Sequence, residues 1–575
     1  MLHKRVWLLF PASLLAACTT TPRPPATGPV EVQILGINDF HGYLEPPKIS
    51  VDAALADGRI AKVPAGGVAY LASAAKALRA GRAHSVTVSA GDMIGATPLV
   101  SALFLDEPTI AAANAVGVEY NAVGNHEFDK GAAELVRMQA GGCEKYTNKV
   151  PCAVEPFAGA TFQFLAANVV RADGTTLFPG SAIKDFGPVQ VGLIGMTLKE
   201  TPTIVPAAGI AGLTFADEAA TANAAVPALK LAGADAIVLV LHQGGRSSGG
   251  YNDKSCPGFD GDIVPILDKL DLAIDVVVSG HTHSSYICER PRPGRRPLLL
   301  TSAGQYGTLI TDIRLTIDPA RGVIAAQADN IIVQGEGFSG TTGAVAIEPA
   351  MAVYAKDGAT QAIVDRYVAA AATQAARVVG RLSGPLTRER SPDLEVIGGN
   401  FIADAQLAAT RGQGAQIAFT NSGGVRADIV PAADGSVTYG QIFAMQPFGN
   451  NLVVTTYTGA QLKAALEQQF DSGRNTVERP NILLPSKGFA FAYDLSRAAG
   501  QRIVEMSLDG KPIDPGAKYR VTVVSFLAGG GDNFTVLMQG TDAVDAGLDL
   551  DATEAYLKAG GGVPELGRIR DLTPR

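Results

Sequence analysis

The chain has 575 residues, of which 47% are hydrophobic and 18% are charged, with a formal net charge of −8 at pH 7. It is too long for one ordinary hydrophobic core and too apolar for a disordered chain, so we expect two large globular domains. The acidic balance excludes the basic surface that polymeric DNA or RNA requires, and we expect no nucleic-acid polymer as a partner.

The N-terminus carries the features of a bacterial export signal. A short basic start at residues 3–5 precedes an apolar run, Val6–Ala17, that is too short to span a bilayer. The run ends in Leu-Ala-Ala-Cys at Cys18, which resembles a lipobox, and the Thr- and Pro-rich residues 19–29 are typical of a flexible tether. We therefore predict a signal peptide over 1–18 and a membrane anchor through lipid on Cys18. The protein would lie in the bacterial cell envelope, facing the periplasm or the cell surface; a plain signal peptide with an incidental Cys is the alternative.

Cysteine usage agrees with export. Besides Cys18 the chain contains four cysteines, Cys143, Cys152, Cys256 and Cys288. An even number outside the cytoplasm favours disulfides over free thiols. Three pairings are possible, and we favour the two between neighbours in sequence. None of the four belongs to a Cys-x-x-Cys pair, so a zinc-thiolate site is not expected.

The predicted elements of the first half alternate between short apolar strands and Ala-rich helices, which is typical of an α/β fold with layered sheets. In chain order they are strand Val32–Ile37, helix Val68–Ala80, strand Ser85–Ser89, helix Thr109–Val116, and strands Tyr120–Val123, Val189–Ile194, Ala236–Leu241 and Val276–Ser279. A Gly- and Thr-rich break at Gly335–Gly343 precedes a largely helical connector, Ala344–Val379, and a second α/β unit follows from about Arg381 to Ile569.

Five of the predicted strands lead directly into residues of metal-binding type. These are Asp39 and His41, then Asp92, then Asn125 with His126 and Asp129, then His242, then His281 and His283. Ligands of α/β sheets bind at the carboxyl ends of strands, and five of the seven histidines of the chain lie in these loops. The alternative is a set of unrelated structural histidines. Imidazole, carboxylate and amide ligands without thiolate suit Zn, Mn, Fe or Co, and seven of them suit two ions that share a carboxylate.

The order Asp-x-His, Gly-Asp, Gly-Asn-His-Glu, His, Gly-His-x-His resembles that of the calcineurin-like metallophosphoesterases. The longer stretch Gly-Asn-His-Glu-Phe-Asp at 124–129 is similar to the 5′-nucleotidase family, and the resemblance covers nearly all of residues 31–570. It implies a four-layer α/β/β/α metallophosphoesterase sandwich over 30–343, a helical linker over 344–379, and a C-terminal α/β nucleotide-binding domain over 380–570.

The resemblance also implies roles for these residues. Asp39, His41 and His283 would hold one divalent ion, Asn125, His242 and His281 the other, and Asp92 would bridge them. His126 and Asp129 would form a catalytic dyad, in which Asp129 orients the imidazole; a cap on a helix beginning near Lys130 is the alternative role of Asp129. A water activated by the two metals would attack phosphorus in line.

Further resemblance lies in the second half. Asn421, Gly424 and Arg426, in the loop after the strand Gln416–Phe419, match the substrate-binding motif of the family. Phe448 and Phe526 would stack on the nucleobase, and Asp532 would contact the ribose hydroxyls. On the residues alone, both aromatic rings could equally belong to the core.

The sequence departs from the family pattern at a position where relatives carry a phosphate-binding Arg. Relatives commonly place an Arg at the start of the first C-terminal helix, whereas Leu394–Asn400 contains none. Arg388, Arg390 or Arg411 would substitute, or Arg426 and the metals would suffice.

The expected function is metal-dependent hydrolysis of nucleotide phosphate esters by a monomer, of 5′-nucleotidase type, extending to UDP-sugars and nucleoside di- or triphosphates. A 2′,3′-cyclic-nucleotide 2′-phosphodiesterase with 3′-nucleotidase action, a sulfohydrolase, and a non-catalytic nucleotide-binding surface protein are the alternatives.

Overall fold

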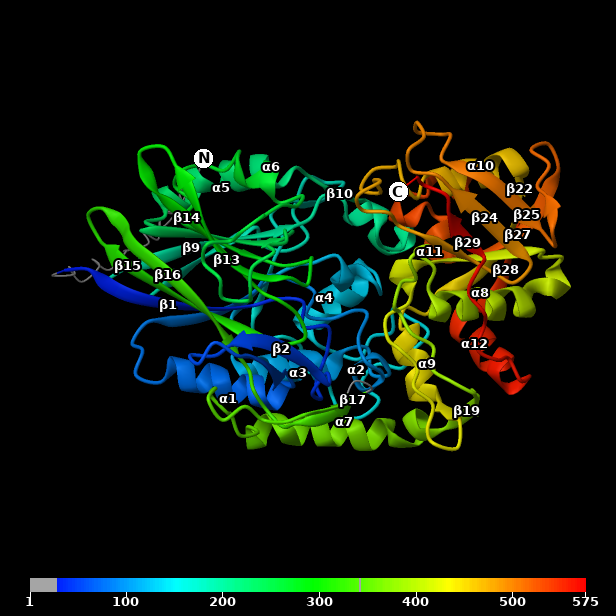
Figure 1. Ribbon diagram of the computed structural model, residues 1–575. Helices are drawn as coiled ribbons and strands as arrows, with labels where there is room; N and C mark the ends of the chain where they lie inside the picture. The colour runs from blue at the N-terminus through cyan, green and yellow to red at the C-terminus, as the bar shows by residue number, and fades with distance from the viewer. Residues whose placement is uncertain (1–27, 341–342, 575) are drawn as a thin grey trace, which may run out of the picture.

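The computed structural model describes residues 28–340 and 343–574. The predicted signal peptide, Cys18 and most of the tether therefore lie outside the described residues. Figure 1 shows two halves side by side, the N-terminal half in blue to green and the C-terminal half in yellow to red. The helix α7 (Gly358–Ala376) runs along the lower edge of the molecule in this view, from below the N-terminal half toward the C-terminal half.

The N-terminal half contains two six-stranded sheets. In spatial order, the first consists of β16 (Gly322–Ile332), β15 (Leu309–Asp318), β1 (Val30–Ile37), β4 (Ser85–Ser89), β5 (Tyr120–Ala122) and β6 (Gln163–Leu165). The second consists of β13 (Ser285–Arg292), β14 (Arg295–Ala303), β12 (Val276–Ser279), β11 (Ala236–His242), β9 (Gln190–Thr197) and β8 (Ser181–Asp185). In each sheet the central strands pair in parallel, so their carboxyl ends share one edge.

These sheets pack face to face, with helices on both outer faces. Because side chains alternate along a strand, Ile34 of β1 faces the second sheet, where it shares a core with Leu193 of β9. The next residue, Leu35, points outward and packs with the helices α1 (Val68–Arg79) and α3 (Glu107–Val116). On the far side, Leu239 of β11 packs with α5 (Glu218–Leu231). The predicted four-layer α/β/β/α sandwich is confirmed.

The C-terminal half is a separate α/β unit with its own core. Its five-stranded mixed sheet has the order β23 (Leu483–Pro485), β20 (Ile417–Asn421), β27 (Lys518–Val524), β22 (Asn451–Thr458) and β28 (Thr541–Leu548). A second sheet contains β26 (Lys511–Pro512), β25 (Ile503–Leu508), β24 (Phe489–Tyr493) and β29 (Ile569–Asp571). Helices α8 (Ile397–Thr410) and α12 (Asp549–Lys558) pack against each other beside these strands.

The connector differs from its prediction, since α7 covers only Gly358–Ala376 of the expected helical segment 344–379. Residues Gly343–Val345 form the strand β18 instead, and Pro349, which lacks an N–H donor, falls in the turns that follow. The helix begins only where Asp357 accepts a hydrogen bond from the backbone N–H of Thr360.

The two halves also share apolar contacts. Leu99 and Ala102 of the short helix α2 (Leu99–Ala102), in the N-terminal half, are buried in the same core as Phe443 of α9 (Tyr439–Met445). Nearby, the ammonium of Lys149 lies 5.7 Å from the ring centre of Phe443. Buried contacts of this kind give the halves a defined relation across the site between them.

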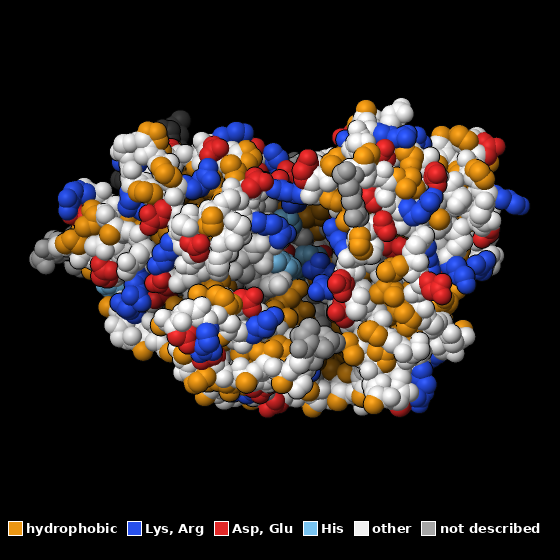
Figure 2. All heavy atoms as spheres, viewed as in Figure 1, with side chains coloured by type: hydrophobic (Ala, Val, Ile, Leu, Met, Phe, Trp, Pro, Cys, Tyr) orange, Lys and Arg blue, Asp and Glu red, His pale blue; other side chains and the backbone are white. Residues whose placement is uncertain are grey.

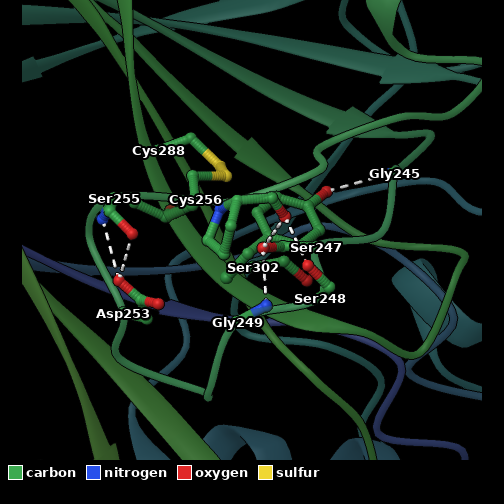
Figure 3. The surroundings of a disulfide bond; sticks show 12 residues. Gly245, Ser247, Ser248, Gly249, Asp253, Ser255, Cys256, Cys288 and Ser302 are labelled. Atoms are coloured by element: carbon green, nitrogen blue, oxygen red, sulfur yellow. Dashed lines mark hydrogen bonds between the residues drawn. A yellow bond between two sulfur atoms is a disulfide. The ribbon is translucent and has the colours of Figure 1, made fainter.

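Both predicted disulfides are confirmed, Cys143–Cys152 and Cys256–Cys288. The second joins the loop after β11 to β13, and Asp253 in that loop accepts hydrogen bonds from Ser255 (Figure 3). Among the described residues, no helix combines the length and apolar character that a transbilayer segment needs.

Candidate active site

The seven predicted metal ligands meet at the carboxyl ends of β1, β4, β5, β11 and β12. Two triads have their ligand atoms within 4.8 Å of one another: Asp39, His41 and His283 form one, and Asp92, His242 and His281 form the other. The loops come from both sheets of the sandwich, and the parallel strands bring them to a common edge.

Distances within the cluster connect the two triads. Nε2 of His41 lies 3.1 Å from Nε2 of His283 and 3.7 Å from Oδ2 of Asp92. The same carboxylate oxygen lies 3.0 Å from Nε2 of His242, which in turn lies 3.1 Å from Oδ1 of Asn125. Asp92 therefore reaches both groups, and Asn125 adds an amide oxygen to the second.

The backbone at the cluster is strained. Asp39, His41, Asp92, His281 and His283 all have φ between 47° and 71°, the left-handed region that non-glycine residues rarely adopt. Such conformations persist only where the surrounding structure holds them, and they concentrate at functional sites.

Backbone carbonyls fix the orientation of two imidazoles. Nδ1 of His41 lies 2.9 Å from the carbonyl oxygen of Gly95, and Nδ1 of His242 lies 2.7 Å from that of Ala90. A carbonyl only accepts, so Nδ1 carries the proton in both rings and Nε2 is left as a ligand atom. Burial holds the pKa of His41 and of His281 well below the ordinary value, which keeps these rings neutral, as metal ligation requires.

Glu127 supports the cluster, a role that its place in the Gly-Asn-His-Glu motif does not by itself indicate. Its buried carboxylate accepts the backbone N–H groups of Asp92, Met93 and Gly124 at 2.9, 2.8 and 2.7 Å. Burial and the charge of Asp92 raise the pKa of Glu127 to about 7. The contacts tie the loop of Asp92 to the loop of Asn125.

The side chains of His126 and Asp129 are in contact. Nδ1 of His126 lies 2.9 Å from Oδ2 of Asp129, which also accepts the backbone N–H of Ala96 at 3.2 Å. The helix that follows, α4 (Ala132–Ala140), has Gly131 at its N-cap, so Asp129 does not cap it. Burial works to lower the pKa of His126, but the carboxylates of Asp129 and Asp92 outweigh burial and raise it.

A cavity of about 320 Å³ lies between the two halves. It is lined by both dyad residues and by all six predicted substrate residues, Asn421, Gly424, Arg426, Phe448, Phe526 and Asp532. A second cavity, of about 400 Å³, lies over the metal-binding residues and shares His126, His281 and Arg426 with the first. Figure 2 shows the hollow between the halves, with histidine side chains exposed at its centre and Lys or Arg side chains beside them.

Within the cavity, residues of the two halves touch. The ring of Phe448 stacks on His126, and the guanidinium of Arg426 lies 5.7 Å from the centre of that ring. Asn421 donates a hydrogen bond of 2.6 Å to Oδ2 of Asp532, and burial raises the pKa of that carboxyl. Phe448 and Phe526 are half-buried and line the cavity, and Phe526 also packs against the C-terminal core.

The arginines expected to replace the family's phosphate-binding Arg do not lie at either cavity. Arg388, Arg390 and Arg411 are exposed, and none of them lines either cavity. Arg474 lines the first cavity and Arg246 the second. The N-terminal residues Ile204 and Pro206 also line the first. No sequence motif marked these four residues, and only the fold brings them to the site.

The donor set fits two divalent ions, because four imidazoles, two carboxylates and one amide converge with their ligand atoms turned inward. A four-layer sandwich with such a cluster at its strand ends defines a calcineurin-like phosphoesterase, a hydrolase of phosphoric esters.

Comparison with known proteins agrees. The family of calcineurin-like phosphoesterases matches residues 32–285, and the C-terminal domain of 5′-nucleotidases matches residues 378–539. Cell wall protein Lmo0130 of Listeria monocytogenes is 30% identical over 95% of this chain and 69% of its own length. Endonuclease YhcR of Bacillus subtilis is 28% identical over 92% of this chain, which spans only 40% of that relative.

Among solved structures, the 5′-nucleotidase precursor of Thermus thermophilus superposes with a TM-score of 0.73 at 27% identity, covering 95% of this chain and all of that one. The chain belongs to the 5′-nucleotidase family.

Proposed function

We propose that the protein hydrolyses the phosphate esters of nucleotides, in the manner of a 5′-nucleotidase. The observation that most supports this proposal is the cavity between the two halves. His126 and Asp129 of the N-terminal half line it, together with Arg426, Phe448 and Phe526 of the C-terminal half. A nucleotide bound there would present its phosphate to the metal-binding residues and its base to the aromatic rings.

The metal ligands would act as two groups, Asp39, His41 and His283 with one ion, and Asn125, His242 and His281 with the other, bridged by Asp92. Two divalent ions, Zn, Mn, Co or Fe, would screen the phosphate charge and lower the pKa of the attacking water. The donor chemistry supports this class of ions without selecting one of them.

The protein side chains would bind and orient the substrate. Arg426 donates to phosphoryl oxygens, and the loop of Asn421 and Gly424 supports it with backbone N–H groups. His126 stabilises charge that develops on the phosphoryl group, while Asp129 holds the imidazole in place. Phe448 and Phe526 stack on the base, and Asp532 accepts hydrogen bonds from the ribose hydroxyls.

The domain bounds and location complete the proposal. The metal-binding domain would extend over 30–343, the linker over 344–379 and the nucleotide-binding domain over 380–570. The signal over 1–18 and the anchor on Cys18 would attach a monomer to the cell envelope. The disulfides and the cell wall name of one relative support an exported location.

A substrate panel tests the proposal. Phosphate release from 5′-AMP, UMP, ADP, UDP-glucose, 3′-AMP and 2′,3′-cyclic AMP is measured with each of the four metals. Release from 5′-AMP and UMP is expected. Hydrolysis of 2′,3′-cyclic AMP without 5′-AMP would favour the cyclic phosphodiesterase, and no release from any nucleotide would contradict the proposal.

A further inference from the structure

A loop of the C-terminal half, residues 472–481, reaches the N-terminal half beside the metal-binding residues. In this loop, Nη1 of Arg474 lies 3.2 Å from Nε2 of His281, and Nε lies 3.0 Å from Oδ2 of Asp262. A guanidinium only donates, so Nε2 of His281 accepts this hydrogen bond. Arg474 also lines the same cavity as Arg426 and the dyad.

The loop is fixed to the proposed ribose-binding segment. The hydroxyl of Ser472 donates to the carbonyl of Asn533 at 2.7 Å, and Nδ2 of Asn475 donates to that of Asp532 at 2.8 Å. Between them Gly473 has φ of +56°, and a Cβ there would lie 2.5 Å from Oδ1 of Asn533. These contacts hold the backbone at Arg474 in place, which lowers the entropic cost of binding an anion.

The remaining donors of Arg474 are available to a ligand. An Arg side chain has five N–H groups, and among the described residues His281 engages Nη1 and Asp262 engages Nε, which leaves the other N–H groups for a ligand. The nearest carboxylate, Asp262, is a half-exposed group of the opposite half. A charged donor at the metal-binding edge of the cavity is well placed to bind anionic oxygen.

We propose that Arg474 binds the phosphoryl oxygens of the nucleotide as a second anchor beside Arg426, and thereby favours terminal phosphomonoesters over cyclic diesters. Two guanidiniums complement the double charge of a monoester better than the single charge of a diester. Asp262 is then a positioning residue that holds Nε. The inference rests on the proposed function, since it requires a nucleotide in this cavity.

Arg474 could instead serve only to join the two halves, and Arg479 provides a matched control. Its Nη2 lies 2.8 Å from Oδ2 of Asp260, and its Nη1 lies 3.7 Å from Oδ1 of Asp262. Arg479 thus pairs with the same acidic loop across the same interface, but it lines neither cavity. A purely interdomain role would make the two arginines equivalent.

The test compares Arg474→Gln, Arg474→Lys and Arg479→Gln in the folded chain, with thermal unfolding as a check on each variant. Calorimetry measures the affinity for AMP and for adenosine on metal-stripped protein, in which AMP is not expected to be hydrolysed. We expect Arg474→Gln to weaken AMP binding at least tenfold and adenosine binding less than twofold, with an intermediate loss for Arg474→Lys. Arg479→Gln should leave both affinities unchanged.

Kinetics give the second measurement. Arg474→Gln should lower the ratio of kcat/KM for AMP to that for 2′,3′-cyclic AMP by about tenfold. Unchanged AMP affinity in Arg474→Gln, or equal losses in Arg474→Gln and Arg479→Gln, would overturn the inference while leaving the proposed function intact. A parent chain that binds neither AMP nor adenosine would contradict the proposed function itself, and the inference with it.

Discussion

The ring of Phe448, in the C-terminal half, stacks on the imidazole of His126, in the N-terminal half, with centroids 6.0 Å apart and planes inclined by 15°. This contact joins a proposed base-binding ring to the proposed catalytic dyad across the domain boundary. Productive geometry therefore depends on both halves at once, because a small displacement of a bound substrate costs a large part of the rate.

Replacing Phe448 with Ala should weaken binding of AMP by roughly 1–3 kcal/mol, the usual contribution of one ring stacked on a base. KM should rise accordingly. Hydrolysis of p-nitrophenyl phosphate, which has no base, should change little and serves as the control. Equal losses with both substrates would indicate that the ring only supports the fold around His126.

The dyad predicts a shift in pH dependence. Asp129 raises the pKa of His126, so Asp129→Asn should lower this pKa and move the alkaline limb of the kcat/KM profile to lower pH, if protonated His126 stabilises phosphoryl charge. His126→Ala should reduce kcat by about 10²–10⁴ with its metal content retained. An unchanged alkaline limb in Asp129→Asn, measured with AMP, would contradict the role of the dyad.

Asp357 links the connecting helix to the N-terminal half through its cap on α7 and its ion pair with Lys76 of α1. The contact with Lys76 and the hydrogen bonds from Thr360 lower the pKa of Asp357 to about 2, from an ordinary value of 3.8. The stabilisation is thus present above about pH 4 and is lost as pH falls toward 2.

Asp357→Ala should therefore lower the free energy of unfolding by about 1 kcal/mol at pH 7, mainly through the lost cap. Asp357→Asn keeps an acceptor and should cost less. Urea unfolding of both variants at pH 7 and pH 3 provides the measurement. A loss of unfolding free energy that is larger at pH 3 than at pH 7 would contradict this explanation.

The disulfides make a separate prediction about stability. Cys256 and Cys288 are 32 residues apart, whereas Cys143 and Cys152 are 9 apart. Serine at both positions of either pair should lower the free energy of unfolding by roughly 2–4 kcal/mol, more for the pair that closes the longer loop. Denaturation under non-reducing conditions measures both variants, and equal stability of all three chains would refute the prediction.

The metal cluster could be predicted because its residues follow strands that sequence patterns identify. Ser85–Ser89 and Val276–Ser279 coincide with β4 and β12, and Asp92 and His281 follow them directly. The carboxyl ends of parallel strands lie at one edge of the sheet. Residues that follow different strands therefore come together even when they are far apart in sequence.

Other parts depend on contacts that no local pattern encodes. Arg474 reaches the site only because its loop is fixed to Asn533 and because Asp262 and His281 lie opposite in the folded chain. Leu99 could not be assigned from the sequence either, because this apolar residue of the N-terminal half packs into the core of the C-terminal half. The helix α7 begins later than the sequence predicts, because one capping residue, Asp357, determines its start.

In the proposed function, seven side chains hold two ions that make nucleotide hydrolysis possible. Stripping the chain of metal, titrating Zn²⁺ or Mn²⁺ back, and following phosphate release from AMP against metal content tests this requirement. We predict no release from the stripped protein and a rise that saturates at two ions per chain, with Asp92→Ala unable to recover. Activity that survives chelation, or that saturates without binding of a second ion, would contradict it.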